Sequence, residues 1–177
     1  MLKSQIFALS SIEIAILIAL TIPTLWALFS APFVPTPMKA VRKMLKLANI
    51  KEGDKIYDLG CGDGRLVHAA SKEYKANAVG FELSPLIFAI AKFLQPFWRS
   101  KAKIKFRNFH SQDISDANVV VCYLMPGTLQ KMLDKFKTLK KGTRIISYSF
   151  KIPGLKLIHE EPRIREQNIC PIWVYEI

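Results

Sequence analysis

The residues with the clearest chemical potential lie in one short loop, residues 58–64, between an apolar pair and a run with helical character. Glycine alternates along this loop at Gly60, Gly62 and Gly64. Because glycine has no Cβ and tolerates positive φ, this spacing lets the backbone turn sharply and approach a ligand closely. The loop therefore predicts a cofactor site at the end of a strand. The alternative is a tight strand-to-helix turn whose acids merely face water.

Carboxylates around the loop indicate which kind of ligand it would hold. A dinucleotide loop sets bare amides and a helix N-terminus against a pyrophosphate, whose charge a carboxylate would oppose. Here Asp58 and Asp63 belong to the loop, and Glu82 closes the next apolar run. These acids favour a cofactor with a cationic head and a ribose. S-adenosylmethionine fits both requirements, since its sulfonium and ammonium groups are positive and its ribose diol suits a bidentate carboxylate such as Glu82.

A sheet must position this loop, and the hydrophobic pattern predicts one. The expected strands are 55–58, 77–81, 103–107, 119–123 and 144–150, with 155–159 and 172–175 as a closing antiparallel pair. The expected helices are 38–49, 65–74, 85–97 and 126–139. This alternation predicts an α/β fold with a Rossmann-like, mostly parallel, doubly wound sheet. The ligand is then expected at the carboxyl ends of the first strands.

The amino-terminal segment predicts a membrane anchor. Residues 14–38 contain no Lys, Arg, Asp or Glu, and this length exceeds the ~20 residues with which a helix crosses a bilayer. A cleaved signal peptide is one alternative, but the residues around Ala31 make a poor cleavage site. A buried core helix is the other, although the following domain has enough apolar elements to close without it. We therefore expect a single transmembrane helix.

Flanking charges and prolines set the expected organisation. Lys3 precedes the apolar segment and several basic residues follow it, which predicts a single-pass protein with its globular part on the cytoplasmic side. The expected parts are an anchor at 1–31, a proline connector with a juxtamembrane basic helix at 32–49, and the cofactor domain at 50–177. Three cysteines without C-x-x-C spacing predict neither disulfides nor a metal site. The net charge of +12 points to an anionic partner: a membrane surface, a nucleic acid or an acidic protein.

The chain resembles class I S-adenosylmethionine-dependent methyltransferases in three blocks: residues 58–65, the turn at 82–85 and the close of a helix at 139–142. An apolar anchor, then Pro32-Phe33-Val34-Pro35, then the glycine loop is similar, more narrowly, to the small membrane-anchored family of protein-lysine methyltransferases. That family includes the mitochondrial enzymes that act on ATP synthase subunit c and on the adenine nucleotide translocase. The likeness covers nearly the whole chain.

This resemblance implies S-adenosylmethionine as methyl donor, S-adenosylhomocysteine as product and a membrane-associated protein as substrate. In it the glycine loop cradles the methionine part, Glu82 holds the ribose, and Asn108 stands where the family usually has an acid near adenine. Asp113 would cap the following loop or only form a turn, and Thr36 would close over the cofactor or serve as a turn hydroxyl. The implied cofactor residues are Asp58, Gly60, Cys61, Gly62, Asp63, Gly64, Glu82, Asn108, Asp113 and Thr36.

The acceptor side is predicted at the end of the fourth strand, in Tyr123-Leu124-Met125-Pro126. Many amino-methylating relatives carry Asn or Asp followed by two prolines there. The missing polar residue argues against a nucleic-acid adenine or glutamine-amide methylase. A lysine amine needs only to lose its proton and to be aligned with the sulfonium. Tyr123 is the expected catalytic residue, either shaping the lysine channel or merely packed in the core, and residues 149–153 would form part of the acceptor wall.

Two other functions remain open on the sequence alone. A methyltransferase for RNA, a lipid headgroup or a small amine could use the basic residues at 101, 103, 105 and 107 to bind phosphate, although such residues are often only solvated. Steeply salt-dependent RNA binding would favour that hypothesis. A non-catalytic S-adenosylmethionine-binding membrane module is the alternative from another class. Failure to bind S-adenosylhomocysteine would exclude both enzyme hypotheses.

Overall fold

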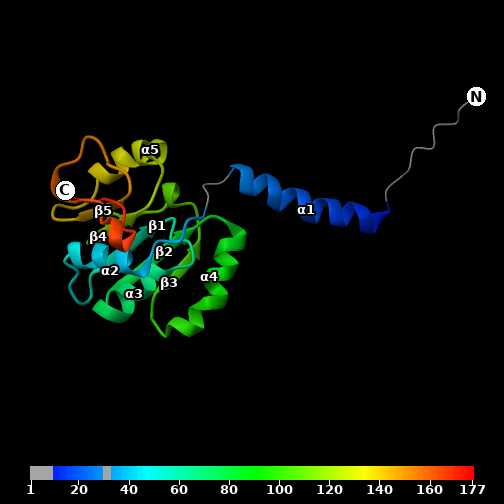
Figure 1. Ribbon diagram of the computed structural model, residues 1–177, viewed down its shortest axis with the longest axis horizontal. Helices are drawn as coiled ribbons and strands as arrows, with labels where there is room; N and C mark the ends of the chain where they lie inside the picture. The colour runs from blue at the N-terminus through cyan, green and yellow to red at the C-terminus, as the bar shows by residue number, and fades with distance from the viewer. Residues whose placement is uncertain (1–9, 30–32) are drawn as a thin grey trace, which may run out of the picture. The chain divides into compact units, whose positions relative to one another are not determined.

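The computed structural model describes residues 10–29 and 33–177. The chain divides into two compact units, Met1–Pro32 and Phe33–Ile177. Among the described residues, the first unit carries one helix, and the second carries the sheet and the glycine loop (Figure 1). The chemistry expected from the sequence therefore lies within the second unit.

The helix of the first unit, α1, spans Ser11–Phe29. It begins with a reciprocal cap in which the Glu13 carboxylate accepts hydrogen bonds from the amide and hydroxyl of Ser10 at 2.8 and 2.9 Å. The Ser10 hydroxyl in turn accepts from the Glu13 amide at 3.3 Å. This pairing is a capping box, which fixes where the helix starts.

The observed helix lies within the predicted anchor, residues 1–31, and the proline connector separates it from the next helix. Helix α1 ends at Phe29, and the next helix begins only at Met38. Pro35 and Pro37 account for the break in the described part of the connector, because proline fixes φ and lacks an amide donor. No helix within the described residues combines the length and the hydropathy that a bilayer span requires. The predicted transmembrane helix is therefore not confirmed.

The second unit is built on one seven-stranded sheet in the order β3-β2-β1-β4-β5-β7-β6. Strands β1 to β5 pair in parallel, whereas β7 runs antiparallel between β5 and β6. The predicted α/β sheet with a closing antiparallel pair is confirmed, with small shifts at strand ends. The strands are β1 Lys55–Leu59, β2 Asn77–Glu82, β3 Lys103–Phe106, β4 Val119–Cys122, β5 Arg144–Tyr148, β6 Leu157–Glu161 and β7 Ile172–Glu176.

The direction of winding reverses between β1 and β4. The chain runs outward from β1 through β2 to β3 and then returns to β4 on the other side of β1. Leu59 at the end of β1 is in register with Cys122 at the end of β4. In doubly wound sheets, ligands bind at the carboxyl ends of the strands beside such a reversal. The topology therefore places the glycine loop and the segment after β4 at the expected ligand position.

Helices cover both faces of the sheet, and all four predicted helices of this unit are present. Helices α2, α3 and α4 contribute to the core on one face, and α5 contributes to the core on the other. Two short 3-10 helices, η1 at Phe109–Ser111 and η2 at Arg165–Gln167, lie in connections. The helices are α2 Met38–Leu47, α3 Arg65–Tyr74, α4 Pro85–Trp98 and α5 Pro126–Lys137.

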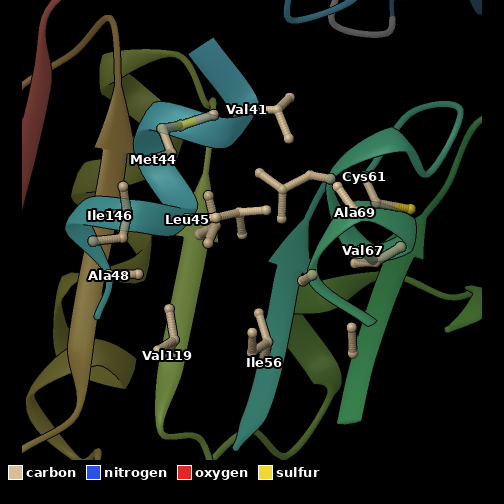
Figure 2. Packing of buried hydrophobic residues seen from close by; sticks show 14 of the residues in the cluster. Val41, Met44, Leu45, Ala48, Ile56, Cys61, Val67, Ala69, Val119 and Ile146 are labelled. Carbon is tan, nitrogen blue, oxygen red and sulfur yellow. The ribbon is translucent and has the colours of Figure 1, made fainter. Parts of the chain in front are cut away.

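Helix α2 belongs to the core of the sheet domain. Figure 2 shows Val41, Met44 and Leu45 among the residues that pack with β1, β4 and β5, and all three are almost fully buried. On its outer side, Arg42 pairs with Glu73 at 3.1 Å and Lys43 pairs with Glu161 at 3.0 Å. The sheet end that carries the glycine loop is thus held by buried packing as well as by strand pairing.

Candidate active site

The glycine loop closes tightly onto the neighbouring strand. Gly60, Gly62 and Gly64 all have positive φ, at 81°, 57° and 82°. The amides of Gly60 and Cys61 both donate to the Phe81 carbonyl, at 3.0 and 2.9 Å. The loop therefore bends back over the end of β2, as the glycine spacing predicts.

Cys61 faces the sheet rather than open space. A Cβ added at Gly80 would come within 2.5 Å of the Cys61 sulfur, so the thiol fills the room that this strand glycine leaves. The side chain is buried, and burial holds the pKa of the thiol well above its usual range. Any contact of Cys61 with a ligand would accordingly involve its backbone.

Glu82 ties the loop to the turn that precedes α4. One carboxylate oxygen accepts from the Gly62 amide at 3.0 Å. The other accepts from the amides of Leu83 and Ser84 at 2.9 and 2.7 Å. The carboxylate is thus fixed between the glycine loop and the turn that precedes α4, and its remaining lone pairs can accept from a ligand. This geometry fits two ribose hydroxyls.

Asp58 is the buried acid of the site. Its relative exposure is 7%, at the penultimate position of β1. Burial, together with the neighbouring charges of Glu82 and Asp63, raises the pKa of Asp58 to about 8. A buried carboxyl in this state is ionised most readily when a positive group arrives beside it. The site is therefore electrostatically suited to a cationic ligand.

Asp63 is paired within the protein. Its carboxylate accepts from Arg65 Nε at 3.0 Å and from Arg65 Nη2 at 2.6 Å. The same guanidinium donates through Nη1 to the Thr36 carbonyl at 2.9 Å. Arg65 thus joins the loop to the proline connector, a role that was not predicted from the sequence. Thr36 lies beside the loop, and its described contact there is made by the backbone carbonyl and not by the hydroxyl.

Phe33 in the connector also packs on the loop. A Cβ added at Gly62 would lie 2.6 Å from Phe33 Cε2, so this ring occupies the space beside the bare glycine. Phe33 remains 43% exposed. This contact was not predicted, because in the sequence Phe33 stands out only as part of the proline motif. The feature that could have indicated this contact is an aromatic residue within a short, stiff connector.

Gly64 is the loop glycine at which a side chain would be most disruptive. It is the N-cap of α3 with φ of 82°, and an added Cβ would overlap the buried Ile104 side chain. We expect Gly64→Ala to lower the free energy of unfolding by about 3 kcal/mol, from left-handed strain plus overpacking. Gly127→Ala is the matched control in α5, because no atom lies within 4 Å of its added Cβ. Equal urea denaturation midpoints for the two variants would contradict this expectation.

The segment after β4 meets the glycine loop and an aromatic cluster. A Cβ added at Gly60 would lie 3.4 Å from Leu124 Cδ2, so the two segments touch. The Tyr123 ring meets Tyr148 edge-on at 5.0 Å and stacks on Phe150 at 6.3 Å. The Tyr148 hydroxyl accepts from the Cys170 amide at 3.0 Å, which fixes its ring. Aromatic faces therefore gather at the carboxyl ends of β4 and β5.

Asn108 and Asp113 occupy caps of local turns. Asn108 Oδ1 accepts from the His110 amide at 3.0 Å, and the preceding Arg107 amide donates to the Glu82 carbonyl at 3.1 Å. Asn108 is thus held near the end of β2, where an adenine would follow a ribose on Glu82. Asp113 Oδ1 accepts from the Ser115 amide at 2.9 Å, which lowers the pKa of Asp113 and gives it a turn role. Within the described residues, no group of three His, Cys, Asp or Glu side chains forms a possible metal site.

The sheet order, the glycine loop and the acids around it define the chain as a class I S-adenosylmethionine-dependent methyltransferase. The family described as "ANTKMT methyltransferase domain" matches residues 58–159, and the chain belongs to this family. The predicted class, family and cofactor are thereby confirmed.

Relatives of known name agree with this assignment. The chain is 40% identical over 127 residues to a protein-lysine N-methyltransferase of Saccharolobus islandicus (strain REY15A), covering 70% of this chain and 79% of that protein. It is 27% identical over 176 residues to the adenine nucleotide translocase lysine N-methyltransferase of Mus musculus, covering 89% and 73%. It also resembles the solved structure of an RNA methyltransferase from Salinibacter ruber in complex with S-adenosyl-L-homocysteine, with a TM-score of 0.74 and 31% identity, covering 81% and 94%.

Proposed function

We propose that this chain, a protein-lysine N-methyltransferase of the ANTKMT methyltransferase domain family, transfers the methyl group of S-adenosylmethionine to a lysine of a membrane-associated protein. The observation that carries the proposal is the buried Asp58 beside the glycine loop, at the point where the sheet reverses its winding. The relative that acts on the adenine nucleotide translocase supports a lysine acceptor on such a protein.

The cofactor residues divide by chemistry. Asp58 and the closely approaching backbone of the glycine loop would hold the amino-acid end, Glu82 would hold the ribose diol, and Asn108 would lie against the adenine. Asp63 acts through Arg65, because their pairing holds the connector against the loop. When bound, S-adenosylmethionine supplies an electrophilic methyl group on a sulfonium. The protein contributes orientation and exclusion of water, which are the main requirements for this transfer.

The aromatic cluster after β4 and β5 suits the acceptor end of the site. A lysine ammonium, methylated or not, is attracted to the faces of tyrosine and phenylalanine rings. Tyr123, Tyr148 and Phe150 contact one another, so their rings keep fixed directions. Such rings could align the amine and keep bulk water away while it loses its proton. Tyr123 therefore has a positioning role in the proposal.

Two variants at Tyr123 distinguish the contribution of its ring from that of its hydroxyl. We expect Tyr123→Ala to lower kcat/KM for the protein acceptor by about tenfold, which is the order of one desolvated cation–π contact. Tyr123→Phe is expected to retain most of the activity. The affinity for S-adenosylhomocysteine, measured by titration calorimetry, should stay unchanged in both. A Tyr123→Phe variant as impaired as Tyr123→Ala would show that the hydroxyl takes part instead.

The apolar amino-terminal helix supports a membrane location for the acceptor. The described side chains Ile12, Ile16 and Leu17 of α1 are 73%, 53% and 54% exposed. Exposed apolar side chains of this kind are typical of segments that bind lipid or another protein. A protein held at a membrane meets membrane-associated acceptors at a raised effective concentration.

Labelled methyl donor tests the proposal directly. The full chain is incubated with labelled S-adenosylmethionine and with membranes from cells that lack the protein. Label should appear in a membrane protein, and mass spectrometry should place it on lysine. RNA from the same cells forms a second arm, because the Salinibacter ruber relative is named an RNA methyltransferase. Label that enters RNA and spares protein would contradict the proposal.

A further inference from the structure

Helix α4 presents an apolar stripe on its outer side. Leu86, Ile90, Phe93 and Phe97 are 66%, 40%, 73% and 74% exposed, and their spacing places them along one side of the helix. Ala91 on another side is fully buried, and the Trp98 ring stacks on His68 of α3 at 5.3 Å. The helix is therefore already packed on its inner side. The stripe is additional apolar surface, of the kind that marks a contact with lipid or protein.

The stretch of chain that carries this stripe is basic and contains no acidic residue. From Leu83 to Gln112 the sequence has no Asp or Glu. Within the described part of the chain, none of the basic residues of this stretch forms an ion pair. Figure 1 shows that α4 and β3 lie side by side at one edge of the domain. The basic residues are Lys92, Arg99, Lys101, Lys103, Lys105 and Arg107.

A hollow at the carboxyl end of α4 brings part of this charge together. It has a volume of about 380 Å³ and is lined by Lys92, Gln95, Pro96, Arg99 and Ser100. The helix dipole disfavours an anion at this end, so attraction must come from the Lys92 and Arg99 side chains. The dimensions and donors suit the phosphate of a headgroup whose acyl chains lie beside Phe93 and Phe97.

We propose that α4 and the adjoining basic edge bind the surface of an anionic lipid bilayer, with the apolar stripe in the acyl boundary and Lys92 and Arg99 on a headgroup phosphate. This combination of a bulky apolar face and flanking basic residues is the character of an interfacial helix. A second copy of the chain fits poorly, because two such edges would bring like charges together. RNA would leave the Leu86 and Ile90 side chains without apolar partners. The contact goes beyond the proposed reaction and does not depend on it.

A fluorescent reporter on α4 of the full chain tests the surface locally. Ala89→Cys, in a Cys170→Ser background, carries an environment-sensitive label on the exposed side of α4; Cys61 and Cys122 are buried. Ile158→Cys, which is 41% exposed on β6 at the opposite edge of the sheet, is the matched control. Vesicles of phosphatidylcholine with phosphatidylglycerol should shift the emission at position 89 to the blue, and vesicles of phosphatidylcholine alone should do so far less. No shift at 89, or an equal shift at 158, would overturn the proposal.

Variants then separate the apolar and cationic parts. Phe93→Gln with Phe97→Gln should weaken the anionic-vesicle response at position 89 by at least about tenfold. Lys92→Gln with Arg99→Gln should weaken it by about tenfold, whereas Lys131→Gln with Lys141→Gln, which changes the net charge equally, should not. Unchanged S-adenosylhomocysteine binding shows that each variant is folded. A response to inorganic phosphate alone, to an RNA oligonucleotide, or to protein concentration without vesicles would assign the surface to a free anion, to RNA or to a second copy.

Discussion

Replacing Glu82 with alanine is expected to weaken S-adenosylhomocysteine binding by at least about a hundredfold. A hydrogen bond to a charged acceptor contributes about 1.5 to 3 kcal/mol, and the proposed ribose contact uses two of them. The affinity is to be measured by titration calorimetry on the full chain. Glu52→Ala is the matched control, since it removes an exposed carboxylate whose described ion pair is with Lys75 at 3.3 Å. Binding that is equally strong in both variants would show that the ribose role is wrongly placed.

Glu82→Ala should also lower the stability of the protein, an effect that follows from contacts seen only in the structure. The Glu82 carboxylate accepts from three backbone amides, those of Gly62, Leu83 and Ser84. Alanine would leave all three without this acceptor, so we expect the free energy of unfolding to fall by about 2 kcal/mol. Glu82→Gln keeps one carbonyl oxygen for the Leu83 and Ser84 amides and should retain more of the stability. Comparing the two variants separates loss of the loop anchor from loss of ligand contacts.

The helices and strands near the site were predictable because their ends have local causes. Ser84 and Pro85 start α4 through a hydroxyl cap and a pre-set φ, and the Ser84 hydroxyl does accept from the Ile87 amide at 3.5 Å. The bounds of the closing strands were predicted less accurately, since a strand was expected at residues 155–159. Strand β6 begins at Leu157 and carries a register irregularity between Leu157 and His159, which no local composition indicates.

The contacts that assemble the site were not predictable, because they join residues far apart in the sequence. Phe33 fills the space beside Gly62, and Arg65 reaches the carbonyl of Thr36. The sequence cannot indicate which backbone carbonyl a side-chain donor will bind, because every residue has such a carbonyl. The pairing of Asp63 with Arg65, two residues along the chain, was not predicted either, and it changes the charge argument. Of the acids expected to face the ligand, Asp63 is already paired with Arg65, so a cationic ligand would interact mainly with Asp58.

Cofactor affinity should therefore depend on pH through Asp58. Burial and the nearby charges of Glu82 and Asp63 raise the pKa of Asp58 to about 8, so at pH 7 the free protein holds a proton there. Binding the cationic end of the cofactor favours the ionised form and releases that proton. Affinity should accordingly rise as the pH increases from 6 towards 8, by up to about tenfold per pH unit, and level off above the pKa. Calorimetry in buffers of different ionisation enthalpy measures the released proton.

Asp58→Asn tests whether this pH dependence comes from Asp58, because the cofactor's own titration is the same with either protein. The asparagine variant should bind S-adenosylmethionine more weakly at pH 8 and should release no proton from this position.

The pH dependence of unfolding should also differ between the two proteins. A carboxyl whose pKa is raised on folding stabilises the protein fully below its unfolded pKa of about 4, and that contribution is lost as the pH rises through its folded pKa of about 8. The free energy of unfolding of the ligand-free protein should thus fall between these pH values by as much as about 1.4 kcal/mol per unit, and Asp58→Asn should flatten this slope. Parallel stability curves for the two proteins would mean that Asp58 is already ionised in the free site.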